Sequence, residues 1–184
     1  MKLVPTASQT VGPYFRIGLE HLCANPAAKG AKTVTVRGRV LDANREPVPD
    51  AMLELWQADL RGQYDSQPES ANSRGRAAGF ARIATADDGS FAFTAGRPGA
   101  VPFDGTRIQA PHIEVLVFAR GLLRQLITRM YFPGEEANAA DPVLQSLPDD
   151  RRATLIARGP SSAAEILEWN IVLQGEDETV FFAW

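Results

Sequence analysis

The sequence predicts an all-β fold: a β-sandwich with an N-terminal arm over residues 1–32 and a short helical insertion. From residue 33 onward, short runs recur in which apolar and polar residues alternate, and such runs are typical of half-buried strands. Gly, Pro, Asn and Asp lie between these runs at turn positions. Only one stretch has the caps and spacing of a helix. We therefore expect one β-sandwich domain over residues 33–184, with the arm as part of it.

The first 32 residues lack this alternation. Gly12 and Pro13 disfavour a regular element there, so we predict an irregular, extended arm.

The strands are predicted from alternation. In Thr33–Leu41 three valines alternate with Arg37 and Arg39, which places the valines on one face of a strand. Two phenylalanines follow the turn signal at residues 87–89 and predict a strand around Phe91 and Phe93. The remaining predicted strands cover residues 51–57, 112–119, 125–132 and 167–174.

The helical insertion is predicted over residues 141–158. Asp141 is a suitable N-cap and Pro142 suits the first helical position. Pro148 should divide the segment into two short helices. The polar stretch from Gln67 to Gly79 predicts a long surface loop, and the apolar C-terminal residues 180–184 should be buried in the fold or against a partner.

Composition excludes several classes of function. The chain has 184 residues, 45% of them hydrophobic, and 19 Lys and Arg against 22 Asp and Glu give a net charge of −3. This balance argues against nucleic-acid binding, and no apolar run is long enough for a membrane span. Cys23 is the single cysteine, so we expect a reducing, cytoplasmic location. Two histidines and three tyrosines leave few ligands for a metal site.

Several segments resemble the intradiol ring-cleaving dioxygenases. The resemblance runs from about residue 8 to the C-terminus, and it implies the prealbumin-like (transthyretin-like) β-sandwich core of that family. Five segments in order carry it, namely QTVGPYF (9–15), ELWQAD with GQY (54–59 and 62–64), APHI (110–113), TRMYF (128–132) and QGEDETVFF (174–182).

The resemblance implies chemistry at ferric iron, which two tyrosines and two histidines hold while a catechol is opened by dioxygen. In this chain Tyr64 stands at the first tyrosine position, but Val101 stands at the second. His112 is followed by Glu114 where the family has a second histidine, and Gln109 replaces the family's catalytic arginine. We therefore expect no autonomous catalytic residue and no metal site in this chain.

The resemblance also implies a partner. In two-subunit members of the family a homologous β subunit carries Fe(III), and several αβ pairs assemble. The α subunit's arm lines the pocket for a small aromatic substrate and O₂. By position, Thr10, Gly12, Pro13 and Tyr14 would form this wall, and Arg129 would face the substrate's carboxylate. We expect no nucleic-acid or membrane partner.

Other interpretations stay open. The segment at residues 10–14 is also typical of a turn with a packed aromatic, and Arg129 could pair only with the partner chain. Tyr64, His112 and Glu114 could form a rearranged metal site. Residues 36–51 and 89–91 also resemble transthyretin-like modules, which serve binding or scaffolding. The tryptophans, expected as core or interface aromatics, are Trp56, Trp169 and Trp184.

Overall fold

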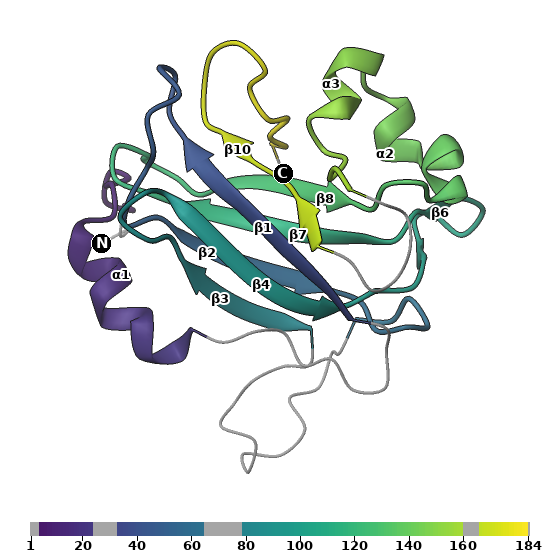
Figure 1. The fold of residues 1–184 in the computed structure, drawn as a ribbon, viewed down its shortest axis with the longest axis horizontal. Coiled ribbons are helices and arrows are strands. Elements are labelled where there is room, and N and C mark those ends of the chain that lie inside the picture. Colours follow the sequence, from purple (N-terminus) through teal and green to yellow (C-terminus); the bar gives the residue numbers. More distant parts are fainter. Residues whose placement is uncertain (1–3, 24–32, 65–78, 160–165, 184) are drawn as a thin grey trace.

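The computed structural model describes residues 4–23, 33–64, 79–159 and 166–183 (Figure 1). Most of its regular structure is strand. The elements, in chain order, are α1 (Pro13–Leu19), η1 (Glu20–Leu22), β1 (Thr33–Leu41), β2 (Met52–Gln57), β3 (Phe80–Ala84), β4 (Ser90–Gly96), β5 (Val101–Pro102), β6 (Ile108–Gln109), β7 (His112–Phe118), β8 (Leu126–Tyr131), η3 (Glu136–Ala140), α2 (Pro142–Gln145), α3 (Asp149–Ala153), β9 (Ile166–Glu168) and β10 (Ile171–Val172).

Two four-stranded sheets contain the long strands. One has the order β3-β2-β7-β8 and is antiparallel throughout. In the other, β1 pairs antiparallel with β4 on one side and parallel with β9 and β10 on the other. A two-stranded sheet of β5 and β6 lies apart from both.

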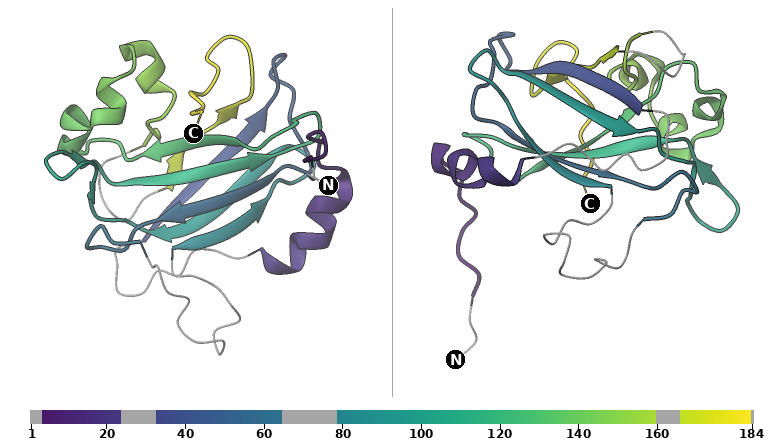
Figure 2. Two further views of the ribbon diagram at one scale, coloured as in Figure 1. Left: turned by 180° about the vertical axis from the view of Figure 1, so that it is seen from behind. Right: turned by 60° about the horizontal axis from the view of Figure 1, so that its bottom comes forward.

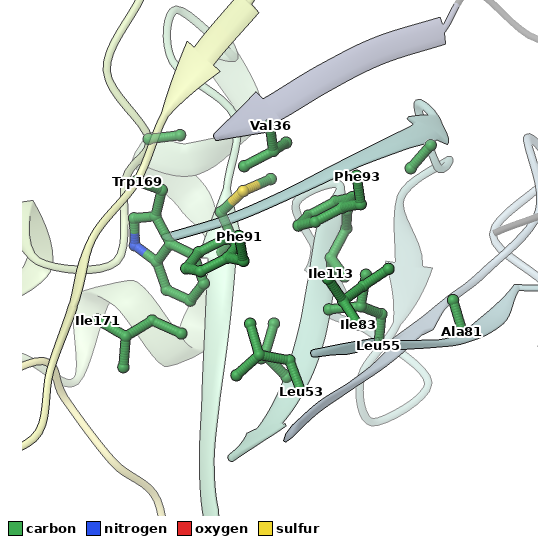
Figure 3. Close-up of a cluster of buried hydrophobic side chains, with 14 of the residues drawn as sticks. Val36, Leu53, Leu55, Ala81, Ile83, Phe91, Phe93, Ile113, Trp169 and Ile171 are labelled. Carbon is green, nitrogen blue, oxygen red and sulfur yellow. The ribbon is translucent and has the colours of Figure 1, made fainter. Parts of the chain in front are cut away.

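The main core forms where side chains of both four-stranded sheets meet (Figure 3). Val36 and Phe93 come from the sheet that contains β1 and β4. Leu53, Leu55 and Ile113 come from the sheet that contains β2 and β7. All five are buried. The alternation predicted for residues 33–41 is confirmed, because the valines are buried while Arg37 and Arg39 are exposed.

A second, smaller cluster lies beneath the helical insertion, which Figure 1 shows beside β8 and β6. Tyr131, Leu144 and Leu155 are its largest buried members. The division of the predicted helix at Pro148 is confirmed: α2 ends at Gln145 and α3 begins at Asp149. The helical segment ends at Ala153, however, and not at residue 158.

The prediction of a wholly irregular arm is wrong. Residues 13–22 form α1 and η1, and Gly12 is the N-cap of α1. Proline at the first helical position loses no hydrogen bond, because that N–H has no intrahelical partner in any helix. Gly12 and Pro13 therefore start a helix here. Before them the chain is extended, and Figure 2 (right) shows it projecting from the body of the molecule.

The single strand predicted over residues 167–174 is also wrong, since two short strands replace it. Both pair with β1 in one continuous register. Between them, the backbone N–H of Arg39 donates to the side-chain oxygen of Asn170 at 2.9 Å. A side-chain acceptor thus takes the place of a carbonyl and interrupts the ladder.

The aromatic predictions have mixed outcomes. Trp169 is buried, but Trp56 is 39% exposed and packs against Phe80 with ring centroids 4.6 Å apart. The C-terminal segment packs as expected: the Phe182 N–H donates to the carbonyl of Ile127 at 2.8 Å, and Val180 is buried. Trp184 and most of the predicted loop at residues 67–79 lie outside the described residues. No helix among the described residues has the length and apolar character to cross a membrane.

Candidate functional site

Two turns carry the positions at which the family resemblance implies tyrosine ligands, and these turns pack on each other. Gly62 has φ +75°, and a Cβ there would collide with the carbonyl oxygen of Ala100. In return, the N–H of Gly99 donates to the Asp59 carbonyl at 2.8 Å. Only glycine permits this close approach of two backbones. The contact places the turn before Tyr64 directly against the turn before Val101.

Val101 begins β5, where its register partner is Gln109 of β6. Its side chain is buried and carries no ligand atom. The second tyrosine position therefore contributes packing alone, and β6 places Gln109 beside it.

His112 is the first residue of β7, and its side chain is buried. Its Nδ1 lies 2.7 Å from the Ala110 carbonyl, so Nδ1 carries the proton that is donated there. Burial, reinforced by the nearby Arg129 guanidinium, lowers the pKa of His112 to about 4. The imidazole is therefore neutral at neutral pH. Its buried Nε2 has no hydrogen-bond partner among the described residues.

Glu114 follows on the same face of β7, and its register partner on β8 is Arg129. The Arg129 Nη2 lies 3.7 Å from Glu114 Oε2, and Nη1 donates to Gln109 Oε1 at 2.6 Å. Arg129 is only 7% exposed. A buried guanidinium thus pairs with Gln109 and Glu114, two of the positions that the family resemblance singles out.

Tyr64 lies at the edge of this group and is 43% exposed. Burial raises the pKa of its phenol; the Glu114 carboxylate raises it further, while Arg129 acts in the opposite direction. The hydroxyl is therefore protonated at neutral pH.

Sequence reasoning missed one buried polar centre next to this group. It identified Asp141 as a helix cap, and the carboxylate does accept from Val143 and Leu144 N–H groups at 2.9 Å. The same carboxylate also accepts from the Ala110 N–H at 2.7 Å and the Tyr131 hydroxyl at 3.3 Å. Asp141 thereby fixes the segment that leads into His112. In the sequence, the only indication of this buried polar centre was the place of Tyr131 in the alternating pattern of β8.

These residues do not fit a ferric ion. Within the described part of the chain, no three His, Cys, Asp or Glu side chains come close enough together to hold a metal. One of the implied ligands is Val101, and the carboxylate of Glu114 is paired with Arg129. A metal ion here would also meet the guanidinium's positive charge. The pairing of Glu114 with Arg129 argues against a rearranged site built from Tyr64, His112 and Glu114, and that site stays a prediction.

The predicted pocket wall lies elsewhere on the chain. Thr10 accepts a hydrogen bond from the Gly121 N–H at 2.8 Å, and Phe15 packs against Phe118 at 5.4 Å between ring centroids. Phe118 is four residues along β7 from Glu114, a separation of about 13 Å. The structure thus gathers Thr10, Gly12, Pro13 and Tyr14 at the far end of β7 and does not bring them to Arg129. Tyr14 is 81% exposed.

A separate open pocket of about 740 Å³ lies between α1 and the outer face of β1 and β4. Three arginines line it, but their charges are largely balanced. Arg16 lies 4.0 Å from Glu20, and Arg39 lies 3.3 Å from Asp88. Glu168 also belongs to its lining. The pocket contains none of the positions implied by the family resemblance.

The chain is similar to known dioxygenases over most of its length. A family model described as "Dioxygenase" matches residues 20–175. The protocatechuate 3,4-dioxygenase alpha chain of Burkholderia cepacia is 39% identical, over 98% of this chain and 98% of its own length. The chain belongs to the intradiol ring-cleavage dioxygenase family. Intradiol dioxygenases are generally Fe(III) enzymes that act on catechols with O₂.

Other family members extend the comparison. The alpha chain from Pseudomonas putida is 38% identical and covers 99% of this chain and 98% of its own length. The corresponding beta chain of Burkholderia cepacia is also a homologue, at 31% identity over 88% of this chain and 74% of its own. Both kinds of subunit therefore share ancestry with this intradiol dioxygenase chain.

Solved structures agree on the fold. The dioxygenase domain of a carbohydrate-binding fusion protein from Streptomyces sp. SirexAA-E has a TM-score of 0.62 and 26% identity, over 83% of this chain and 90% of that one. Catechol 1,2-dioxygenase from Pseudomonas arvilla C-1 has a TM-score of 0.61 over 82% of this chain and 55% of that one, at 22% identity. The strands of this intradiol dioxygenase chain follow the family's architecture.

Proposed function

We propose that this chain is the iron-free α subunit of a protocatechuate 3,4-dioxygenase. Paired with a homologous β subunit that carries Fe(III), it would contribute to converting protocatechuate and O₂ into 3-carboxy-cis,cis-muconate. In that reaction the ring bond between the two hydroxyl-bearing carbons breaks, and both atoms of dioxygen enter the product. The observation that carries the proposal is 39% identity to an alpha chain. The pairing of the Arg129 guanidinium with Glu114, at a position where the resemblance implies a metal ligand, supports it.

The proposed contribution of this chain is a wall of the partner's substrate pocket. Gly12 and Pro13 start α1 at a fixed point of the chain, and the next residue, Tyr14, presents an aromatic face and a hydroxyl to the outside. The Thr10–Gly121 hydrogen bond holds the preceding segment against the body. An exposed aromatic on an anchored helix suits contact with a flat aromatic ring.

The role predicted for Arg129 as a substrate contact stays a prediction. Its guanidinium is buried and directed at Gln109 and Glu114 within this chain. That placement favours a role inside the subunit.

The remaining parts of the proposal concern architecture and assembly. We propose that the two four-stranded sheets form the prealbumin-like β-sandwich, with residues 1–32 as an interface arm and residues 33–184 as the domain. Several αβ pairs would assemble into the complete enzyme. The single cysteine favours a cytoplasmic location.

The experiment is co-expression of this chain with its β partner, followed by metal analysis and steady-state kinetics with protocatechuate. Tyr14→Ala should lower kcat/KM about tenfold or more, because a contact to the substrate is lost, and should leave the iron content of the complex unchanged. Val4→Ala is the matched control, since Val4 is equally exposed on the same arm. Equal kinetics for the two variants would refute the proposed wall. An iron-loaded, active homo-oligomer of this chain would refute the subunit assignment.

A non-enzymatic transthyretin-like binding or scaffold module was the alternative from the sequence. The same experiment separates the two functions. A chain that stays monomeric and never co-purifies with a β subunit would favour the scaffold module.

A further inference from the structure

The surroundings of Arg129 are those of a cation site. Gln109 from β6 presents its amide oxygen at 2.6 Å, and Glu114 from β7 presents a carboxylate oxygen at 3.7 Å. The ring of Phe182 faces the guanidinium carbon at 5.8 Å from its centroid. Aromatic faces carry partial negative charge. Acceptor groups from three separate segments thus converge on one positive charge.

These acceptors include positions that the family uses around its metal. Glu114 stands at a ligand position, and Gln109 stands at the position of the family's arginine. Gln109 is also the β-ladder partner of Val101, which stands at another ligand position. The side chain of Arg129 crosses from β8 into this space. The arginine that the family has before β7 is absent here, and an arginine on β8 supplies positive charge instead.

Electrostatics make this arrangement mutually dependent. A buried guanidinium is stable only when it is paired and hydrogen-bonded, and Glu114 and Gln109 meet both needs. Glu114 is partly buried, so its carboxylate is also costly to leave without a cation. Glu114 and Arg129 carry opposite charges, so this pair is balanced without a metal.

We propose that Arg129 is the resident cation of these positions: its guanidinium holds the vacated ligand positions together and keeps metal ions out of them. The inference rests on the proposed function in that this chain is taken to be the iron-free subunit. It adds the physical reason why the loss of ligands leaves a stable fold.

The first test is stability of the full chain in denaturant. Arg129→Met keeps an unbranched apolar stem and removes the guanidinium with its charge. We expect the unfolding equilibrium constant to rise about a hundredfold, because Glu114 and Gln109 lose their partner. Arg129→Lys should show a smaller rise, since a single ammonium cannot reach both acceptors as a guanidinium does. Adding Glu114→Gln to Arg129→Met should recover part of the loss.

The matched control is Arg39→Met. Arg39 pairs with Asp88 at 3.3 Å, but both side chains are more than half exposed. Exposed pairs contribute little, so this variant should unfold as the unmodified chain does. If Arg129→Met is as stable as Arg39→Met, Arg129 only fills space and the proposal fails.

The second test is metal uptake. The double substitution Val101→Tyr/Glu114→His restores the ligand types of the family. With Arg129 retained it should remain metal-free, and with Arg129→Met added it should take up Fe³⁺ at least tenfold more tightly. Equal uptake by both chains overturns the exclusion of metal. If circular dichroism shows that these chains do not fold, the test is Co²⁺ titration of the single Arg129→Met variant. A Co²⁺ affinity equal to that of the unmodified chain would also overturn the exclusion of metal.

The two proposals can fail separately. A stable, metal-indifferent Arg129→Met chain overturns this inference and leaves the proposed subunit function intact. Unchanged kinetics of the Tyr14→Ala complex remove the proposed pocket wall and leave the role of Arg129 untouched.

Discussion

Acidification should destabilise this chain through His112 in particular. The imidazole is buried beside the Arg129 guanidinium, and these surroundings depress its pKa from an ordinary value of 6.5 to about 4. The unfolded chain therefore binds a proton more tightly than the folded chain does. The stabilisation by neutral His112 is fully present above pH 6.5 and is lost as the pH falls from 6.5 toward 4.

The size of the effect follows from the two pKa values. A difference of this size corresponds to about 3 kcal/mol in the free energy of unfolding once the pH is below both values. At pH 5 about 2 kcal/mol of it should already be lost. Ordinary carboxylates contribute less at that pH, because most of them titrate near pH 4.

The assay is urea unfolding of the full chain at pH 7, 6 and 5, compared with His112→Asn. The amide of asparagine can still donate to the Ala110 carbonyl, where Nδ1 donates now, but it does not titrate. The substitution should cost stability at pH 7, because it leaves a cavity. The difference in the free energy of unfolding between the unmodified chain and His112→Asn should then be about 2 kcal/mol smaller at pH 5 than at pH 7. His21→Asn, at an exposed position, controls for loss of a histidine as such.

Parallel stability curves for the unmodified chain and His112→Asn between pH 7 and pH 5 would refute this reasoning. They would mean that the buried ring gains its proton without penalty, and so that water or a neighbouring group reaches Nε2.

Three further predictions follow from the backbone and the arm. Gly62→Ala should cost about 2 kcal/mol or more in unfolding assays, because its Cβ meets the Ala100 carbonyl; Gly105→Ala, with φ +81° and open space around it, should cost only about 1 kcal/mol. Asp141→Ala should lower the free energy of unfolding by about 3 kcal/mol, since it removes a helix cap and leaves buried donors without an acceptor; an unchanged denaturation midpoint would contradict this. Deleting residues 1–15 should reduce turnover of the co-expressed complex while the iron content, measured by metal analysis, stays constant.

The alternation of apolar and polar residues correctly predicted strands in which one face is buried and the other is exposed. The alternation in residues 33–41 identified β1 with both its ends, because each valine faces the core and each arginine faces water. The same reasoning failed at Gly12 and Pro13, where the residues that break helices internally are those that start one. It also failed at Asn170, since nothing in the spacing of residues 167–174 indicates that a side chain will replace a carbonyl in the ladder.

The candidate site was predictable only in part. Motif positions identified Tyr64, Val101, His112 and Glu114, and alternation could have paired Glu114 with Arg129 across β7 and β8. The hydrogen bond from Arg129 to Gln109 could not be predicted in this way. This bond depends on the position of β6 relative to β8, which belong to different sheets. Packing between segments distant in the sequence sets that position.

The geometry around Tyr64, Val101, His112 and Glu114 is held by contacts that involve no metal. The turns before Tyr64 and Val101 are joined by backbone contacts through Gly62 and Gly99, and these contacts need no ligand atom. The start of β7 is fixed from another side by the hydrogen bond of Ala110 to Asp141. The turns before Tyr64 and Val101 and the start of β7 are therefore held in place without a metal. Their charges must still be balanced, because Glu114 is partly buried and a carboxylate there needs a cation. Substitutions that remove metal ligands are then tolerated on one condition, that a positive side chain enters the same space, and Arg129 meets that condition.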